Sequence, residues 1–150
     1  MPISVPATPR ATTSPSRALA RMSRVIENAL ATEDLSLSQY RLLAFLSQGD
    51  WAASALADRL DVSRPSITGL VDGLVKRGLV ERRPDTGDRR RVDHVLTTAG
   101  KRALRAADDR ADAGVSEVLS HLPADIAADA HAALLRVGDA LDARRQDKLR

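Results

Sequence analysis

Apolar residues between positions 63 and 78 recur at the spacing of an amphipathic helix. They follow the i, i+3, i+4 and i+7 pattern, at Ile67, Leu70, Val71 and Leu74. Ser63 is a favoured N-cap, Pro65 is tolerated in a first helical turn, and Gly78 is placed to end the helix. The pattern therefore predicts a short helix with one face in the core and one polar face.

The pattern changes to that of a β-hairpin directly after this helix. Leu79 and Val80 begin a predicted strand, residues 84–88 have the composition of a turn, and residues 89–96 predict the returning strand. Basic residues outnumber acidic ones between positions 76 and 91. A charge run alone is more often a solvated face. A basic hairpin behind a short amphipathic helix, however, is typical of a winged helix-turn-helix that binds DNA.

The first third of the chain predicts an arm followed by two helices. Residues 1–16 hold several prolines, serines and threonines and too few apolar groups to offset the entropy of ordering, which predicts a disordered arm. Contact with phosphates through Arg10 is an alternative role for this arm. Residues 17–34 carry an apolar stripe at helical spacing, and Ser36 with Gln39 forms a capping box in front of a second helix.

Two long helices are predicted after the hairpin. The first covers about residues 98–119, and Pro123 opens the second, whose polar tail over 144–150 is expected to fray. The second helix carries an apolar stripe at Ile126, Ala130, Leu134, Val137 and Leu141. Because helices this long need partners, residues 17–34 and 98–145 are predicted to be the dimerisation helices of a two-fold homodimer. Such a dimer would space its recognition helices by about 34 Å, one turn of DNA.

Six short motifs follow one another in a specific order between positions 56 and 100. They are LADRL at 56–60, VSRPSIT at 62–68, LVD at 70–72, RGLVER at 77–82, DRR at 88–90 and LTTAG at 96–100. In this order and spacing they resemble the MarR (multiple antibiotic resistance regulator) family of bacterial transcription factors. The resemblance implies a mainly α fold with a small β-wing, in which a winged helix-turn-helix lobe over 36–97 is flanked by the dimerisation helices. The whole would form a single domain over 17–150.

The resemblance also implies partners. They are a second copy of the chain, a pseudo-palindromic operator in double-stranded DNA, and usually a small effector that releases the DNA. It places a very short strand at Asp50 and Trp51 and the first helix of the helix-turn-helix over 53–60. Asp61 stands in the following turn where the family often has glycine, and Asp tolerates a left-handed backbone better than most residues.

The polar side of the recognition helix carries the first candidate DNA contacts. They are Ser63, Arg64, Ser66 and Thr68. Short hydroxyls reach phosphates or base edges, and an arginine can fork onto a guanine, whereas Ser63 is expected mainly to cap the helix. Asp72 is expected to form a salt bridge within the chain, because phosphate repels a carboxylate. Gly69 and Gly73 stand where the family often has arginine, and they indicate close approach of the backbone to DNA or to another helix.

The hairpin carries the second set of candidate DNA contacts. They are Arg82, Arg83, Arg89, Arg90 and Arg91. The resemblance implies that Asp88 braces the turn and that Arg90 enters the minor groove, while Arg89 and Arg91 contact phosphates or pair with the brace. An inserted arginine responds to groove width, so A·T-rich flanks are expected.

A site for the effector is implied between the DNA-binding lobe and the dimerisation helices. The resemblance favours a small apolar or aromatic acid as the ligand, with Tyr40, Leu43 and Trp51 as the candidate pocket residues. The ligand would favour a spacing of the recognition helices that no longer fits the groove, which predicts a repressor that the effector relieves.

Composition removes several other functions. The 150 residues hold no cysteine, so neither a disulfide nor a thiol switch can form. His94, His121 and His131 are not at ligand spacing and no glycine-rich phosphate loop occurs, so no enzyme, metal or cofactor is expected. A metal sensor using His121 and His131 is an alternative. No apolar run predicts a membrane span or signal peptide, which indicates a cytoplasmic protein.

Two alternatives keep the fold and change the function. Gly69 and Gly73 weaken direct sequence readout by the recognition helix, so a sequence-tolerant architectural DNA-binding protein is the main alternative. A protein-interaction module that has lost DNA binding is a second, and the wing arginines argue against it. The net charge of +3 is compatible with DNA binding because the positive charge is concentrated on the wing.

Overall fold

The computed structural model describes residues 14–49, 51–84, 87 and 91–148. Its elements are α1 (Pro15–Ala31), α2 (Leu37–Leu46), β1 (Trp51–Ala52), α3 (Ala53–Leu60), α4 (Arg64–Lys76), β2 (Val80–Pro84), β3 (Val92–Leu96), α5 (Thr98–Leu119) and α6 (Ala124–Lys148). The fold is mostly helical with a small antiparallel sheet, which confirms the predicted fold class. None of the described helices is long and apolar enough to cross a membrane.

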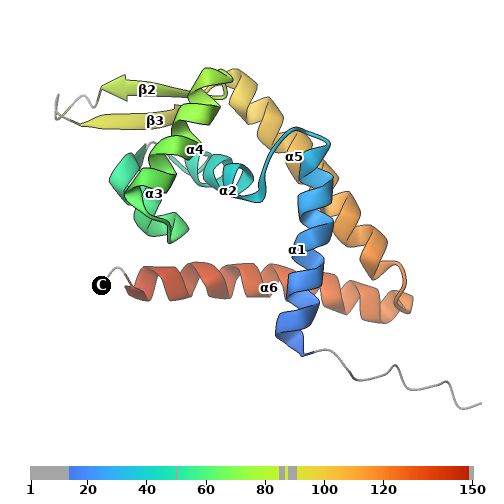
Figure 1. Cartoon of the computed structure of the whole chain (residues 1–150). Coiled ribbons are helices and arrows are strands. Elements are labelled where there is room, and N and C mark those ends of the chain that lie inside the picture. The colour runs from blue at the N-terminus through green and yellow to red at the C-terminus, as the bar shows by residue number, and fades with distance from the viewer. Residues whose placement is uncertain (1–13, 50, 85–86, 88–90, 149–150) are drawn as a thin grey trace, which may run out of the picture.

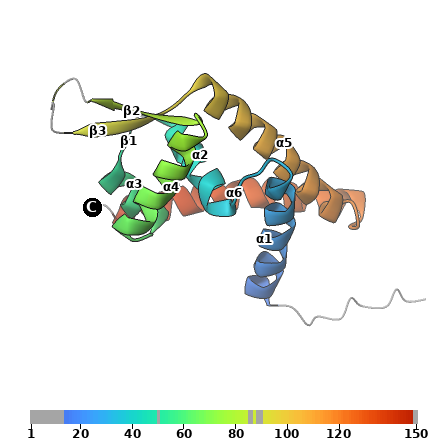
Figure 2. The same ribbon diagram turned by 45° about the horizontal axis from the view of Figure 1, so that its top comes forward.

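The elements form a lobe and a helical scaffold (Figure 1). The lobe consists of α2, α3, α4 and the sheet, and the scaffold consists of α1, α5 and α6. The helices α1 and α5 lie side by side and make extensive contact. α5 starts at the sheet and leads away from the lobe, and α6 turns back toward the lobe in both views (Figures 1 and 2).

The sheet is the wing together with its base. Its three strands have the order β1-β3-β2, so the hairpin strands β2 and β3 pair with each other and β1 joins the outer edge of β3. Both pairings are antiparallel, with Val80 opposite Leu96 and Trp51 opposite His94. The short β1 therefore attaches the segment in front of α3 to the base of the wing.

The core lies inside the lobe and extends along α5. Its fully buried aliphatic side chains come from α1, α2, α3, α4 and β2, and they are Leu30, Leu42, Leu43, Leu56, Ile67, Val71, Leu74 and Val80. The predicted apolar face of α4 is confirmed, because Ile67, Val71 and Leu74 are buried and Leu70 packs against the core from the edge.

Local capping explains where most helices begin and end. The predicted capping box is present, with Ser36 and Gln39 each bonding the other's backbone N–H. Asp61 ends α3 with φ 55°, which confirms the predicted left-handed turn. Ala52 precedes α3 without a side-chain cap bond.

Three predicted boundaries differ from the structure. α1 begins at Pro15 and not at Arg17, because the Ser14 hydroxyl accepts from Arg17 N (3.3 Å) and proline suits a first turn; residues 1–13 of the predicted arm lie outside the described residues. β3 begins at Val92, where pairing with Pro84 starts, and Arg91 is not part of it; residues 89 and 90 of the predicted strand lie outside the described residues. α6 remains helical to Lys148, through most of the tail that was expected to fray.

Candidate nucleic-acid interface

The first turn of α4 is built around two serine hydroxyls. Ser63 Oγ accepts from Ser66 N at 3.3 Å and lies 2.8 Å from Ser66 Oγ. Ser63 therefore acts as the predicted N-cap, and the Ser66 hydroxyl forms a hydrogen bond with the Ser63 hydroxyl. Both residues are exposed.

The next polar groups of α4 lie on the same exposed side. The Thr68 hydroxyl donates its hydrogen to Arg64 O within the helix, at 3.0 Å. Toward solvent, the Thr68 oxygen can therefore only accept a hydrogen bond. Arg64 is exposed at the N-terminal end of the helix. Arg64, Ser66 and Thr68 thus form one exposed polar edge at the start of α4.

An ion pair connects the recognition helix to the wing. The Arg82 guanidinium on β2 pairs with the Asp72 carboxylate on α4, and both side chains are about half exposed. The predicted salt bridge of Asp72 within the chain is confirmed. Arg82, proposed as a DNA contact, therefore also has a structural role in holding the wing against α4.

Two other wing arginines lie next to carboxylates. Arg83 pairs with Glu81 on β2, and Arg91 Nε donates to Asp93 Oδ1 at 3.1 Å. Such exposed pairs contribute little stability, but they restrict where the guanidinium groups point. Asp88, Arg89 and Arg90, which carry the predicted brace and the minor-groove contact, lie outside the described residues.

The two glycines of α4 have open surroundings. A Cβ added at Gly69 would meet no described atom within 4 Å, and one at Gly73 would make only an ordinary contact with Gln39 Nε2 of α2, at 3.9 Å. Among the described residues, neither position therefore needs glycine for close packing against another helix, which was one of the two predicted reasons for these glycines. Both positions leave the backbone of α4 open on its outer side.

The base of the wing contains a buried histidine, His94. The sequence predicts a strand at this position but not the burial of the side chain. His94 is 4% exposed, and its Nδ1 lies 3.1 Å from Trp51 O. Because a carbonyl only accepts, Nδ1 carries the hydrogen. The Arg59 guanidinium stacks over the Trp51 ring, 4.0 Å from its centroid. This cluster joins α3, β1 and β3 beneath the wing.

The end of α4 is attached to the start of α5. Thr97 Oγ1 donates to Gly78 O at 2.7 Å and accepts from Gly100 N at 3.0 Å, so it caps α5 while holding the turn after α4. A Cβ at Gly100 would lie 2.0 Å from Leu79 O. Thr97 and Gly100 both belong to the LTTAG motif. The preference of threonine for helix N-caps is the sequence signal that could have indicated the start of α5 here.

A tyrosine connects the lobe to the scaffold on the other side of α2. Tyr40 OH donates to Asp108 Oδ1 on α5 at 2.7 Å. Burial, the hydrogen bond to Asp108 and the negative charges of Asp108 and Asp112 all raise the pKa of Tyr40 well above its usual range. The phenol therefore stays protonated and continues to donate at any physiological pH.

The structure separates the three predicted pocket residues. Leu43 is fully buried in the core. Tyr40 lines a cavity of about 200 Å³ between α2 and α6, and neither Leu43 nor Trp51 is among its lining residues. The Trp51 ring lies under Arg59 instead.

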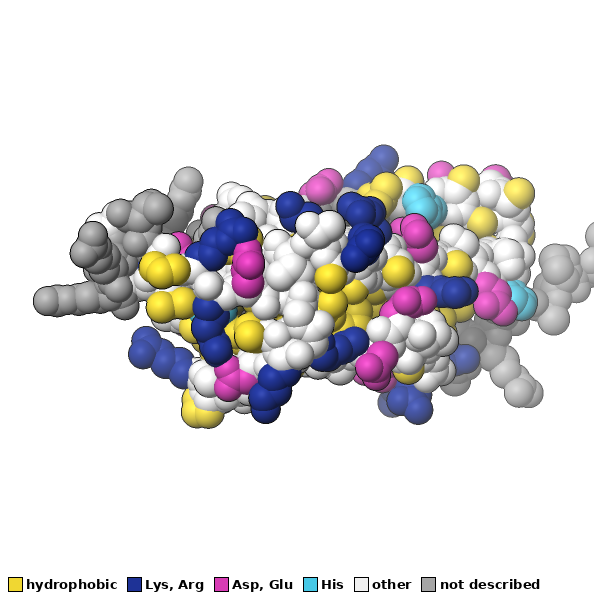
Figure 3. All heavy atoms as spheres, turned by 90° about the horizontal axis from the view of Figure 1, so that it is seen from above, with side chains coloured by type: hydrophobic (Ala, Val, Ile, Leu, Met, Phe, Trp, Pro, Cys, Tyr) yellow, Lys and Arg dark blue, Asp and Glu magenta, His cyan; other side chains and the backbone are white. Residues whose placement is uncertain are grey.

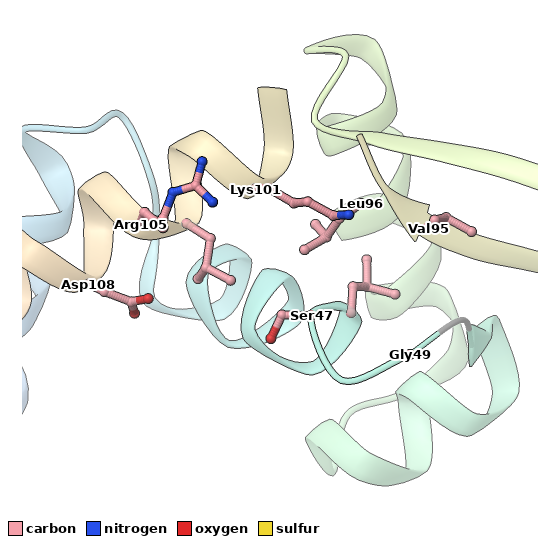
Figure 4. A pocket seen from close by; sticks show the side chains of 9 residues that line it. Ser47, Gly49, Val95, Leu96, Lys101, Arg105 and Asp108 are labelled. Carbon is pink, nitrogen blue, oxygen red and sulfur yellow. The ribbon is translucent and has the colours of Figure 1, made fainter. Parts of the chain in front are cut away.

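A larger cavity of about 430 Å³ opens where α2, β3 and α5 meet (Figure 4). Leu46, Leu96 and Leu104 give it apolar walls, and Lys101, Arg105 and Asp108 from α5 give it charged ones. In Figure 4 the Lys101 side chain extends from α5 toward Leu96. The cavity thus combines apolar walls with two cationic side chains and one carboxylate, so its charge is positive on balance.

Positive charge also predominates on the part of the surface near the wing. Seen from above, Lys and Arg side chains outnumber acidic ones on the half of the face that carries the lobe, whereas the two signs are mixed over the scaffold (Figure 3). Among the described residues, no group of three or more histidines and carboxylates could hold a metal ion. His121 and His131 are both exposed.

Comparison with known proteins agrees with this geometry. The model of the MarR family matches residues 33–91. The chain is 34% identical to the HTH-type transcriptional regulator FarR of Neisseria gonorrhoeae over 109 residues, which cover 69% of this chain and 74% of that protein. The chain belongs to the MarR family. Members of this family are transcription regulators and not enzymes.

A second relative of this MarR-family chain is the HTH-type transcriptional repressor YetL of Bacillus subtilis. It is 37% identical over 87 residues, which are 56% of this chain. The chain spans about half the length of that relative, since the match covers 52% of it.

Solved structures share the fold. Wild-type MarR of E. coli in its apo form is 24% identical, with a TM-score of 0.71 over 83% of this chain and 97% of that chain. A mutant of S. aureus MepR bound to an oligodeoxyribonucleotide is 23% identical, with a TM-score of 0.63 over 83% and 92% of the two chains. CouR of Rhodococcus jostii RHA1 bound to p-coumaroyl-CoA is 26% identical, with a TM-score of 0.64 over 81% and 87% of the two chains.

Proposed function

We propose that this chain is a homodimeric, sequence-specific DNA-binding transcriptional regulator that acts as a repressor relieved by a small effector. The observation that carries the proposal is the Asp72–Arg82 ion pair, which joins the recognition helix to the wing. A helix in the major groove and a wing on the flanking backbone bind DNA together when their relative orientation is restrained, and this pair, although about half exposed, is one restraint on it. The relatives named as an HTH-type repressor and an HTH-type regulator support the same function.

The proposed DNA contacts divide between helix and wing. Arg64 forks onto a guanine, and the hydroxyls of Ser66 and Thr68 accept from cytosine or adenine amino groups in the major groove. On the wing, Arg90 enters the minor groove with Asp88 as its brace. Ser63 stays the helix cap, while Arg82, Arg83, Arg89 and Arg91 provide positive charge toward phosphates.

Dimerisation is proposed through the scaffold. α6 exposes apolar side chains along its length, among them Ile126 (47% exposed), Val137 (48%) and Leu141 (53%). Burying such a stripe against a second copy removes apolar area from water. Two copies related by a two-fold axis would then present their recognition helices to successive turns of DNA.

The effector is proposed to bind in the cavity of about 430 Å³. Lys101 and Arg105 favour an anionic group, and Leu96 and Leu104 favour an apolar body, which together describe an organic acid or its thioester. CouR, whose structure holds p-coumaroyl-CoA, lends support to a ligand of this class. The cavity touches β3 and α5, so a ligand there could alter the angle between wing and scaffold.

Selection of operators from random DNA tests the DNA-binding function. We expect the purified chain to enrich a pseudo-palindrome with A·T-rich flanks, and Arg90→Ala to weaken binding of that DNA by more than about a hundredfold. Arg24→Ala on α1 is the matched control, because it removes one exposed arginine outside the lobe. After analytical ultracentrifugation has shown that this variant assembles as the wild type does, it should also bind the DNA as the wild type does. Unchanged binding by Arg90→Ala would refute the minor-groove contact.

Fluorescence of Trp51 tests the effector site. Trp51 Nε1 lies near Gly49, which lines the cavity, so a bound ligand should change the emission of the single tryptophan. We expect phenolic acids and their thioesters to produce a saturable change that Lys101→Gln weakens. A flat titration across such acids would contradict this site without affecting the DNA-binding proposal.

A sequence-tolerant architectural role is the second candidate. The observation behind it is the open backbone at Gly69 and Gly73, which leaves few side chains on α4 to read bases. A regulator should prefer its operator to unrelated DNA by about 10³ or more at the same salt concentration, and an architectural protein should not.

A further inference from the structure

We propose that Arg77 is a positioning residue, which sets the angle of the recognition helix on the scaffold by binding the turn between α1 and α2. The inference rests on the proposed DNA-binding function. It states that Arg77 contributes to this function without touching DNA. Arg77 is the C-cap of α4, and the turn it reaches lies 43 residues earlier in the chain.

The contact is made mainly to the backbone. Arg77 Nη1 donates to Asp34 O at 2.7 Å, and Arg77 Nη2 lies 3.5 Å from Asp34 Oδ2. The Arg77 side chain is 33% exposed whereas that of Asp34 is 96% exposed. The carboxylate is therefore screened by water, and the carbonyl, a fixed acceptor, carries the interaction.

The turn that accepts Arg77 is itself held in place. Glu33 N and Leu35 N both donate to Leu30 O, at 3.0 and 3.1 Å, and the side chains of Leu30 and Leu35 are buried. On its outer side Arg110 Nε of α5 donates to Glu33 Oε1 at 3.1 Å. The carbonyl of Asp34 is thus a rigid part of the α1 and α5 scaffold.

Two attachments then hold the C-terminal end of α4. One is the contact of Arg77 with this turn, and the other is the bond of Thr97 Oγ1 to Gly78 O. The buried face of α4 already fixes the helix within the lobe. The two attachments at its C-terminal end add one link to the α1–α2 turn and one to the start of α5, and so fix the direction of α4 relative to the scaffold. In a dimer, that direction determines the distance between the two recognition helices.

Arg77→Gln and Asp34→Gly form a matched pair of variants. Glutamine removes the guanidinium contact and the charge. Glycine removes only the exposed carboxylate and keeps the carbonyl, and it suits the φ of 55° at this position. If the backbone contact positions α4, only Arg77→Gln will alter DNA binding.

The experiment measures binding of the selected operator and of the same operator with one base pair inserted between its half-sites. We expect Arg77→Gln to bind the parent operator about tenfold or more weakly, the usual effect of losing a charged hydrogen bond, and to lose most of the preference for the parent spacing. Asp34→Gly should keep both within about twofold of wild type. Amide exchange of Arg77→Gln without DNA should rise at residues 33–35 and in the last turn of α4.

The dependence of DNA affinity on salt concentration distinguishes a positioning role of Arg77 from a direct phosphate contact. A residue that neutralises one phosphate lowers the slope of log K against log salt by about 0.9 when it is removed, whereas a positioning residue leaves the slope unchanged. A shallower slope with intact spacing preference, or wild-type binding and exchange in Arg77→Gln, would overturn the positioning role. Failure of the wild-type chain to select any operator would instead refute the proposed function, and the positioning role with it.

Discussion

The two long helices of the scaffold, α5 and α6, follow each other in the chain but are packed very differently. α5 buries Leu104, Ala107, Ala111 and Leu119, and it lies along α1 and against the lobe. α6 has no buried residue among its described side chains, although it carries apolar residues at helical spacing at Ile126, Ala130, Leu134, Val137 and Leu141. Periodicity therefore shows that a helix needs a covered face, but it does not show which chain covers it.

This difference predicts that α5 contributes to the stability of the single chain and α6 to the assembly of the dimer. Changes in α5 should unfold the chain, because its neighbours are α1, α2 and the sheet of the same molecule. Changes on the stripe of α6 should leave the fold intact and act on the dimer. Four variants and one control variant test this division.

Gly100→Ala should have the largest effect on folding. The added Cβ would lie 2.0 Å from Leu79 O and 3.2 Å from a methyl of Leu96. Because Leu79 O is a backbone atom, this clash can be relieved only by moving α5 away from the wing. We expect a loss of about 3 kcal/mol or more in the free energy of unfolding, measured by urea denaturation. A midpoint close to that of the wild type would contradict the close packing at this junction.

Charges on the stripe of α6 should separate the subunits. We expect Val137→Asp with Leu141→Asp to give a monomer in analytical ultracentrifugation, with its helix content retained and its operator affinity lost. Ala128→Asp is the control, because position 128 is exposed and lies about two and a half helical turns before Val137, on the opposite face of α6. A monomer that still bound a palindrome tightly would overturn the dimer proposal.

The hydrogen bond of Tyr40 to Asp108 on α5 should make the stability of the fold depend on pH in the alkaline range. Its raised pKa means that the folded state keeps the phenol proton above pH 10, where an unfolded tyrosine loses it. This contribution to stability is complete below about pH 10 and declines as pH rises toward the folded pKa. We expect no tyrosinate absorbance from the single tyrosine near pH 10 until the chain unfolds.

Tyr40→Phe serves as the matched variant for this titration. It should cost about 1–3 kcal/mol at neutral pH, because Asp108 loses a hydrogen-bond donor. It should also remove the alkaline component of the stability loss. Ionisation of Tyr40 in the folded wild type near pH 10 would show that the phenol is not held by Asp108.

Gly138→Ala should have the smallest effect. No described atom lies within 4 Å of a Cβ at this position, and alanine favours a helix over glycine by about 0.5–1 kcal/mol. We expect a slightly higher melting temperature with unchanged dimerisation. A loss of stability would indicate that the partner subunit covers this part of α6 closely.

Sequence patterns predicted the parts of the fold that depend on near neighbours. The apolar face of α4, the Ser36 capping box and the left-handed Asp61 all follow from spacing or from intrinsic preference. The Asp72–Arg82 pair was half predicted: repulsion from phosphate indicated a partner for Asp72, but not which arginine it would be.

Contacts between distant segments could not be predicted in this way. The bonds of Tyr40 to Asp108, of Arg77 to Asp34 and of His94 to Trp51 join residues between 43 and 68 positions apart. No local periodicity encodes them, because they depend on how the lobe sits on the scaffold. Leu43, one of the three predicted pocket residues, belongs to the core, and its spacing in the sequence did not distinguish a core position from a pocket position.

The most direct test of the account is competitive DNA binding by the purified chain. Fluorescence anisotropy would compare a selected palindrome with its single half-site, at one salt concentration and with excess unrelated DNA. We predict two chains bound per palindrome and a preference of about 10³ or more over unrelated DNA. Binding that disappears under the competitor, or equal affinity for palindrome and half-site, would contradict a dimeric, sequence-specific regulator.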